Sequence, residues 1–260
     1  VKVTKTVSKI GNDGEYEIKF KVEGKDVETT TVSTKPIYAV VVFDRSGSME
    51  STETKKCVSW KTMPLIGIRY CDDYKTVSDN KWESAVDGAK LFARTLRNRF
   101  SNANLSLVAF DTNVSVLTNP NGDGFGNSDF DSINFGEPYG VTNLTGALNK
   151  AKELLDAKEG DYTKYVVVIS DGAPTNSSGY ATDSAKNAAI NAAKLIKDED
   201  VKIFSIGYKT DETTSATLRS ISSGDGYYAD ADPETVAAKF SEITSNITSS
   251  TFAGTEAVLK

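Results

Sequence analysis

The sequence predicts an α/β fold in which a doubly wound, mostly parallel sheet is flanked by helices. Four apolar runs carry the strand signal, at residues 37–43, 105–110, 165–169 and 201–206. They lack polar alternation, which is typical of strands that are buried on both faces of a parallel sheet. A helical pattern follows each run, at residues 82–100, 145–157, 182–197 and 233–247. This alternation indicates a doubly wound sheet, whose ligands bind where the carboxyl ends of the strands open into loops.

A different pattern opens the chain. Residues 1–35 alternate polar and apolar side chains on either side of a turn at residues 11–14, which predicts a two-stranded β unit. Two strands alone are only marginally stable, so we expect them to belong to a flanking β domain. The tail at residues 251–260 is again strand-like, and we expect it to return to that unit. The α/β domain then spans residues 36–250.

Two long insertions interrupt the α/β pattern, at about residues 49–80 and 118–139. Connections in α/β units usually have about 2–6 residues, and longer loops are often functional or disordered. The first insertion reads as an irregular stretch and holds both cysteines, Cys57 and Cys71. In an exported protein these two would pair, whereas in a cytosolic chain they would remain free thiols.

The insertions also concentrate aromatic residues, namely Trp60, Tyr70, Phe125, Phe130 and Tyr139. Aromatic side chains in long loops can form a rim that contacts a ligand. They can equally form small cores inside their own loops. Both interpretations stay open.

The absence of histidine excludes whole classes of chemistry. It removes Ser-His-Asp and Cys-His catalysis and most zinc sites, and leaves oxygen ligands that suit magnesium, calcium or manganese. A net charge of −6 argues against nucleic acid and anionic membranes as partners. No apolar stretch approaches the roughly 20 residues of a membrane helix. We expect an excised piece of a longer protein, with its export signal and anchor outside it.

Three short segments carry the oxygen-bearing side chains that a divalent cation prefers. The first, Asp44 to Ser48, follows the first apolar run; the second lies just before a helix; the third ends the run at 165–169. The segments read Asp44-Arg45-Ser46-Gly47-Ser48, Gly140-Val141-Thr142-Asn143 and Ser170-Asp171-Gly172. The alternative is that Asp44 and Ser46 only satisfy a turn and that Thr142 caps a helix.

This order of segments resembles a von Willebrand factor A-type (integrin I-like) domain over about residues 36–250. The metal-ion-dependent adhesion site of that family is matched here by Asp44, Ser46, Ser48, Thr142 and Asp171. The resemblance implies that hydroxyls touch the ion while the aspartates act through water or hydrogen bonds. The cation then stays electrophilic and can accept an oxygen from a partner. Magnesium is the expected ion, with manganese or calcium as alternatives.

The similarity is strongest to the A domains of Gram-positive pilus-tip and surface adhesins, in which β segments flank the domain. It implies an extracellular module on a bacterial cell wall or pilus that binds a host matrix protein, receptor or glycan. Other surface subunits would contact the flanking β region. Five Asn-x-Ser/Thr sequons favour a bacterial source, because a glycan on Asn143 would crowd the neighbouring Thr142.

Lys5 shares one strand face with Val1, Val3 and Val7. Buried lysines are rare unless they are paired. Surface domains of this kind often join such a lysine to an asparagine in an isopeptide bond. The alternative is a strand lysine whose ammonium reaches solvent.

Two further functions remain as alternatives to adhesion. One is a structural module whose metal only ties the strand ends together. The other is a magnesium-dependent phosphotransferase, because an aspartate after a strand is similar to the nucleophile of haloacid-dehalogenase-like enzymes. Those enzymes need a second acid two residues later, where this chain has Ser46. Without histidine the chain also has few side chains suited to general acid–base catalysis, so we expect it not to be an enzyme.

Overall fold

The computed structural model describes residues 2–10, 15–23, 35–64, 68–118 and 130–253. The chain divides into two units, Val1–Ser33 and Thr34–Lys260. The first unit pairs β1 (Lys2–Ile10) with β2 (Glu15–Glu23) in antiparallel register, with Lys5 opposite Phe20. The predicted two-stranded β unit is therefore confirmed. Its turn and its side chains, that of Lys5 included, lie outside what is described, so the isopeptide bond stays a prediction.

The second unit is built on a six-stranded sheet in the order β10-β9-β8-β3-β6-β7. All neighbours pair in parallel except β7, which runs antiparallel to β6. The strands are β3 (Ile37–Asp44), β6 (Asn104–Phe110), β7 (Val114–Val116), β8 (Thr163–Ser170), β9 (Lys202–Tyr208) and β10 (Tyr228–Ala231). This arrangement confirms the predicted fold class.

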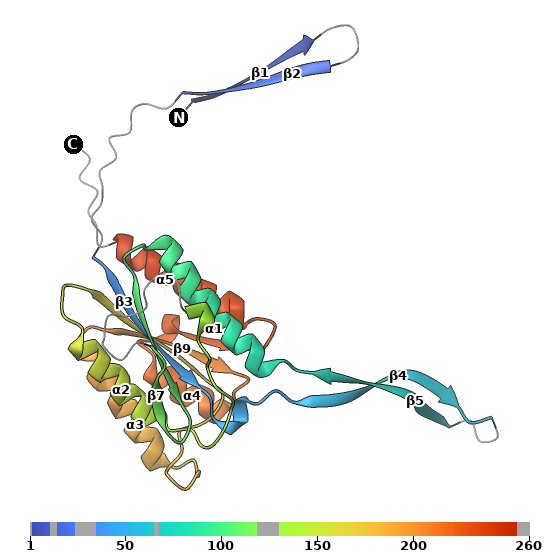
Figure 1. The fold of residues 1–260 in the computed structure, drawn as a ribbon, viewed down its shortest axis with the longest axis vertical. Coiled ribbons are helices and arrows are strands. Elements are labelled where there is room, and N and C mark those ends of the chain that lie inside the picture. The colour runs from blue at the N-terminus through green and yellow to red at the C-terminus, as the bar shows by residue number, and fades with distance from the viewer. Residues whose placement is uncertain (1, 11–14, 24–34, 65–67, 119–129, 254–260) are drawn as a thin grey trace. The chain divides into compact units, whose positions relative to one another are not determined.

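Helices cover both faces of the sheet (Figure 1). They are α1 (Lys81–Arg99), α2 (Leu144–Ala157), α3 (Asp183–Lys197), α4 (Glu212–Ile221) and α5 (Val236–Ala253). The central strand β3 supplies both cores. Phe43 and alternate residues face α1 and α5, whereas Tyr38, Val40 and Val42 face α2 and α3. Double-sided burial explains the unbroken apolar run of this strand.

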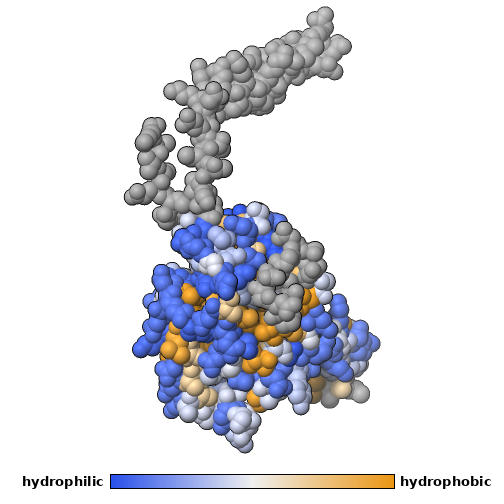
Figure 2. Space-filling model, turned by 60° about the vertical axis from the view of Figure 1, so that its left-hand side comes forward, coloured by the Kyte–Doolittle hydropathy of each residue, from blue (hydrophilic) through white to orange (hydrophobic). Residues whose placement is uncertain are grey.

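On the face shown in Figure 2, hydrophilic residues cover much of the coloured surface, and apolar residues lie among them in separate groups. Among the residues that the structure describes, no helix is both long enough and apolar enough to cross a membrane.

Two helices differ from the predictions. α5 continues to Ala253, so Phe252, at the start of the predicted strand-like tail, belongs to a helix, and residues 254–260 lie outside the described part. The segment 236–253 contains no glycine or proline that would end it earlier. α4 was not predicted, because its Thr- and Ser-rich sequence has weak helix propensity. Its start is fixed by Asp211, which accepts a hydrogen bond from the Thr214 backbone.

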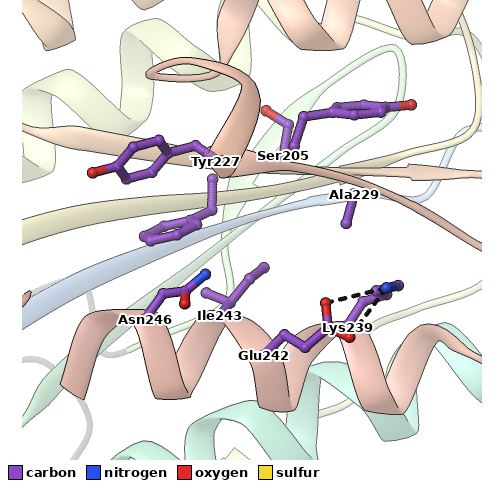
Figure 3. A pocket seen from close by; sticks show the side chains of 10 residues that line it. Ser205, Tyr227, Ala229, Lys239, Glu242, Ile243 and Asn246 are labelled. Carbon is purple, nitrogen blue, oxygen red and sulfur yellow. Dashed lines mark hydrogen bonds and ion pairs between the residues drawn. The ribbon is translucent and has the colours of Figure 1, made fainter. Parts of the chain in front are cut away.

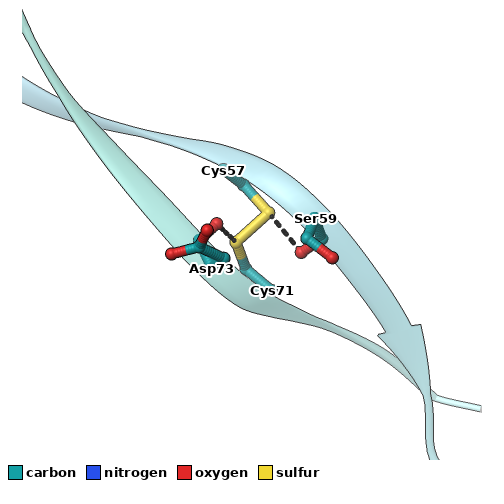
Figure 4. Close-up of a disulfide and its surroundings, with 4 residues drawn as sticks. All are labelled: Cys57, Ser59, Cys71 and Asp73. Carbon is teal, nitrogen blue, oxygen red and sulfur yellow. Dashed lines mark hydrogen bonds between the residues drawn. A yellow bond between two sulfur atoms is a disulfide. The ribbon is translucent and has the colours of Figure 1, made fainter.

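The first insertion is regular, which corrects the expectation of an irregular stretch. β4 (Glu53–Thr62) and β5 (Arg69–Ser78) form an antiparallel hairpin that extends from the sheet domain (Figure 1). A disulfide joins Cys57 and Cys71, with a Cα–Cα distance of 5.7 Å (Figure 4). The strands are exposed on both faces, so they show no alternation of buried and polar positions that sequence reasoning could detect.

The second insertion contributes to the core. Phe130 is only 2% exposed, and its ring lies 6.0 Å from that of Phe135, which in turn lies 4.9 Å from the ring of Phe43. Phe130 is thus a core residue of the sheet domain, so of the two open interpretations the rim does not apply to it. Residues 119–129, including Phe125, lie outside the described part.

The hairpin should depend on its disulfide more than the sheet domain does. The bond closes a loop of about 15 residues, which stabilises by about 3 kcal/mol on chain-entropy grounds. We expect Cys57→Ser/Cys71→Ser to make the hairpin amides exchange rapidly with deuterium while the main thermal transition stays in place. A fall in that transition would show instead that the hairpin stabilises the sheet domain.

Candidate metal centre

Three chain segments meet at one edge of the sheet. β3 ends at Asp44, and the adjacent parallel strand β8 ends at Ser170, one residue before Asp171. Because parallel strands end on the same side, these two aspartates arrive at the same edge. The Gly47 backbone N–H donates to the Gly140 carbonyl at 3.2 Å. This bond ties the loop after β3 to the segment that carries Thr142.

Asp44 is a fully buried carboxylate. One of its oxygens accepts the Ser46 backbone N–H at 2.8 Å, and the other accepts the hydroxyl of Ser170. Burial and the nearby charge of Asp171 raise the pKa of Asp44 to about 7, although hydrogen bonds from Ser170 and Ser46 oppose this rise. Two acids close together in a buried site favour a bound cation, since the cation relieves both desolvation and repulsion.

The hydroxyls of the site converge on Asp171 and Gly172. Ser46 Oγ lies 3.1 Å from Ser48 Oγ, and Ser48 Oγ donates to Asp171 Oδ1 at 2.7 Å. A Cβ on Gly172 would lie 3.1 Å from Thr142 Oγ1 and 3.5 Å from Ser48 Oγ. These distances place the five predicted residues together. The cap of α2 is Asn143, which accepts the Gly146 N–H at 3.1 Å, so Thr142 is not needed as a cap.

Lys81 is a member of this cluster that sequence reasoning missed. It is the first residue of α1, and its Nζ forms an ion pair with Asp171 Oδ2 and donates to the Ser48 carbonyl at 2.7 Å. The Lys81 side chain is 11% exposed and that of Asp171 is 2% exposed. Lys81 lies beyond the inserted hairpin, and a lysine in the first turn of a helix is ordinary in sequence.

A second ion pair positions the loops. Arg45 Nε donates to Asp111 Oδ2 at 2.7 Å, and both side chains are largely buried. The Asp111 carbonyl accepts the Asn143 N–H at 3.1 Å. Asp111 therefore links the loop after β3 to the start of α2, beside Thr142. Neither Asp111 nor Ser170 was singled out from the sequence, because each is a common residue type in a turn.

The donor set fits a hard divalent cation. It offers hydroxyl oxygens and only two carboxylates, and in the described part of the chain no three or more His, Cys, Asp or Glu residues gather in a metal-holding group. Magnesium, manganese and calcium prefer oxygen ligands. The residues present therefore fit such an ion, in a site that is poor in charge.

The predicted aromatic rim, Trp60, Tyr70, Phe125 and Tyr139, is divided. Tyr139 is 76% exposed and lies beside the site, because its backbone N–H donates to the Arg45 carbonyl at 2.8 Å. Trp60 and Tyr70 lie on the hairpin, with Trp60 56% exposed.

An acidic cleft lies between the hairpin base and the site loops. Its lining is Glu50, Ser51, Glu53, Ser78, Trp82, Glu83, Glu137 and Pro138.

Another pocket lies between α5 and the β9–β10 edge (Figure 3). Tyr227, Ile243 and Asn246 line it, and Lys239 pairs with Glu242 at its side. It shares no residue with the five-residue cluster, so it is separate from the candidate metal centre.

The fold and site agree with a comparison to known families. A model of the von Willebrand factor type A domain matches residues 71–244, so the chain belongs to this family. The match includes Thr142 and Asp171, whereas Asp44, Ser46 and Ser48 precede it across the inserted hairpin. A search of curated proteins found no significant match.

Solved structures with the same fold include bacterial pilus proteins. The vWF domain of the type V pili tip protein Mfa5 from Porphyromonas gingivalis has a TM-score of 0.59 at 14% identity, covering 87% of this chain and 99% of that one. The pilus adhesin SpaC from Lactobacillus rhamnosus GG has a TM-score of 0.61 at 18% identity, covering 94% of this chain. This chain spans about a third (34%) of SpaC.

A further structure with this fold contains a metal. Manganese-loaded TRAP protein from Plasmodium vivax has a TM-score of 0.50 at 18% identity, covering 78% of this chain and 71% of that one.

The hydrogen bond between Ser170 and Asp44 should stabilise the fold. Removing a donor to a buried carboxylate costs about 2 kcal/mol, so we expect Ser170→Ala to lower the free energy of unfolding by that amount in EDTA. Ser205→Ala is the matched control, because Ser205 Oγ is buried on β9 and has no hydrogen-bond partner among the described residues. Urea denaturation measures both changes. Equal costs for the two variants would contradict a structural role for the Ser170 bond.

Proposed function

We propose that this chain is an extracellular adhesive module that holds a divalent cation at Asp44, Ser46, Ser48, Thr142 and Asp171 and uses it to bind a host ligand. The observation that carries the proposal is the convergence of three separate segments. Their hydroxyls lie around Gly172, beside two buried carboxylates. Family membership gives independent support.

Each residue has a distinct part in this proposal. Ser46, Ser48 and Thr142 would offer neutral oxygens to the ion, while Asp44 and Asp171 supply negative charge and orient the hydroxyls. The bound cation supplies an electrophilic centre that accepts an oxygen from the ligand. Asp44 is suited to orientation because its two oxygens are already engaged by Ser46 and Ser170.

Magnesium is the ion we propose, with manganese or calcium as alternatives. The hydroxyl-rich donor set does not distinguish these ions by chemistry, because all three prefer oxygen. The TRAP structure holds manganese, which supports a divalent cation as the class of cofactor.

The ligand we propose is a host matrix protein, receptor or glycan with an acidic group for the ion. The acidic cleft beside the site favours a ligand that also carries a basic group close to its acidic one. Neighbours named as a pilus tip protein and a pilus adhesin support a place on a bacterial surface or pilus. The N-terminal β unit would then contact other surface subunits, and the A-type domain would span residues 36–250.

The two alternatives are less well supported. A phosphotransferase needs an accessible nucleophile, but Asp44 is fully buried and hydrogen-bonded. A purely structural metal is compatible with the cluster itself. It leaves unexplained the exposure of Ser48 at the edge of the site and of Tyr139 beside it.

Removing a site residue should abolish adhesion without unfolding the domain. Asp44→Ala and Thr142→Ala remove a charge and a hydroxyl from the proposed site, so we expect both to eliminate stabilisation by MgCl₂ and binding to matrix proteins. The control Thr213→Ala changes an exposed residue of α4 and should behave as wild type. Calorimetry and solid-phase binding, each with and without EDTA, give the measurements. If binding survives both substitutions and EDTA, the metal site does not mediate adhesion.

The hairpin should contact the ligand if Trp60 belongs to the binding surface. The chain has two tryptophans, of which Trp60 is 56% exposed and Trp82 is 9% exposed. In Trp82→Phe, Trp60 is the chain's only tryptophan, and we expect its fluorescence to shift to shorter wavelength when a tryptophan-free matrix fragment binds in magnesium. An unchanged spectrum at saturation would show that ligand binding does not involve the hairpin around Trp60.

A further inference from the structure

The Lys81 ammonium occupies an unusual place for a lysine. Its Nζ is held between Asp171 Oδ2 and the Ser48 carbonyl, both of which belong to residues of the proposed metal site. Lysines are almost never this buried unless they are paired. Their charge must then be balanced by a fixed partner.

The backbone of Lys81 is fixed as firmly as its side chain. Its N–H donates to Asp79 Oδ1 at 3.2 Å, and its carbonyl accepts the hydroxyl of the buried Tyr208 at 2.7 Å. The stem therefore starts from a defined point at the beginning of α1. The position of the ammonium is therefore set by the backbone as well as by its two partners in the site.

The charges of the cluster can be counted. Asp44 and Asp171 contribute two negative charges when both are ionised, and Lys81 contributes one positive charge. In that fully ionised state, the metal-free cluster with Lys81 carries −1, and a divalent ion would bring it to +1. Without Lys81 the corresponding charges would be −2 and 0.

On this basis, and resting on the proposed metal site, we propose that Lys81 is a built-in counter-cation that stabilises the metal-free cluster and lowers its affinity for the divalent ion. It engages one oxygen of Asp171 while Ser48 engages the other. A like charge beside the ion also opposes metal binding in a site of low dielectric constant. The same charge leaves the loaded site positive, which favours an acidic ligand.

The test compares metal binding by wild type, Lys81→Met and Lys81→Arg. We expect Lys81→Met to unfold at lower temperature in EDTA, to gain more stability from MgCl₂ than wild type, and to bind Mg²⁺ about tenfold more tightly or better. Lys81→Arg keeps the charge and should retain an affinity near that of wild type. Isothermal titration calorimetry and thermal unfolding give both quantities without any adhesion assay.

The matched control is Lys197→Met. Lys197 Nζ also donates to backbone carbonyls, those of Ser220 and Ser222, but it belongs to α3 and takes no part in the site. Its replacement should lower stability equally with and without magnesium and leave the dissociation constant unchanged. If Lys81→Met does not fold in EDTA, Lys81→Gln retains a hydrogen-bond donor and is titrated instead.

The outcomes separate this inference from the proposed function. Equal magnesium affinities of wild type and the uncharged Lys81 variants would overturn the role of Lys81 and leave the metal site intact. Absence of magnesium, manganese and calcium binding in every variant would overturn the metal site, and the role of Lys81 with it. Binding by Lys81→Met alone would support the role of Lys81 but overturn the proposed function, because the ammonium would then take the place of the ion in the wild-type protein.

Discussion

Burial of the Asp44 carboxylate at the end of the central strand is the constraint on which the site depends. A buried carboxylate is costly unless its oxygens are engaged, and here Ser46 and Ser170 engage one oxygen each. These two bonds fix the loop after β3 and join it to the end of β8. Arg45, in the same loop, forms an ion pair with Asp111, whose carbonyl accepts the Asn143 N–H at the start of α2. The segments that carry Ser48, Thr142 and Asp171 are thus positioned relative to one buried charge.

The sequence was most informative where burial is complete. The run at β3 is apolar without alternation because its residues face two cores, and this pattern predicts a parallel sheet with helices on both sides. The three site segments could be located because they stand at strand ends and a helix start, which a parallel sheet brings to one edge. The five residues within them were then chosen by the resemblance to the family's metal site.

The sequence was least informative where packing is absent or distant. The β4–β5 hairpin has no buried face, so its residues carry no periodic signal, and its disulfide replaces a core. For Phe130 the choice between a rim and a core stayed open, because nothing in the local sequence shows that its ring packs with those of Phe135 and Phe43. Lys81 was missed for the same reason, since its partners Ser48 and Asp171 are close only after folding.

The sheet topology explains why the candidate site lies at this edge of the sheet. β3 and β8 are adjacent, but β3 leads to α1 on one face of the sheet while β8 leads to α3 on the other. Their connections therefore diverge at the carboxyl ends of the two strands, which is the topological switch point of an open α/β sheet. Asp44 and Asp171 stand there at the ends of the two strands, and Lys81, at the start of α1, forms its ion pair with Asp171. A cation bound there would connect the loops that follow the two strands, which lead to helices on opposite faces of the sheet.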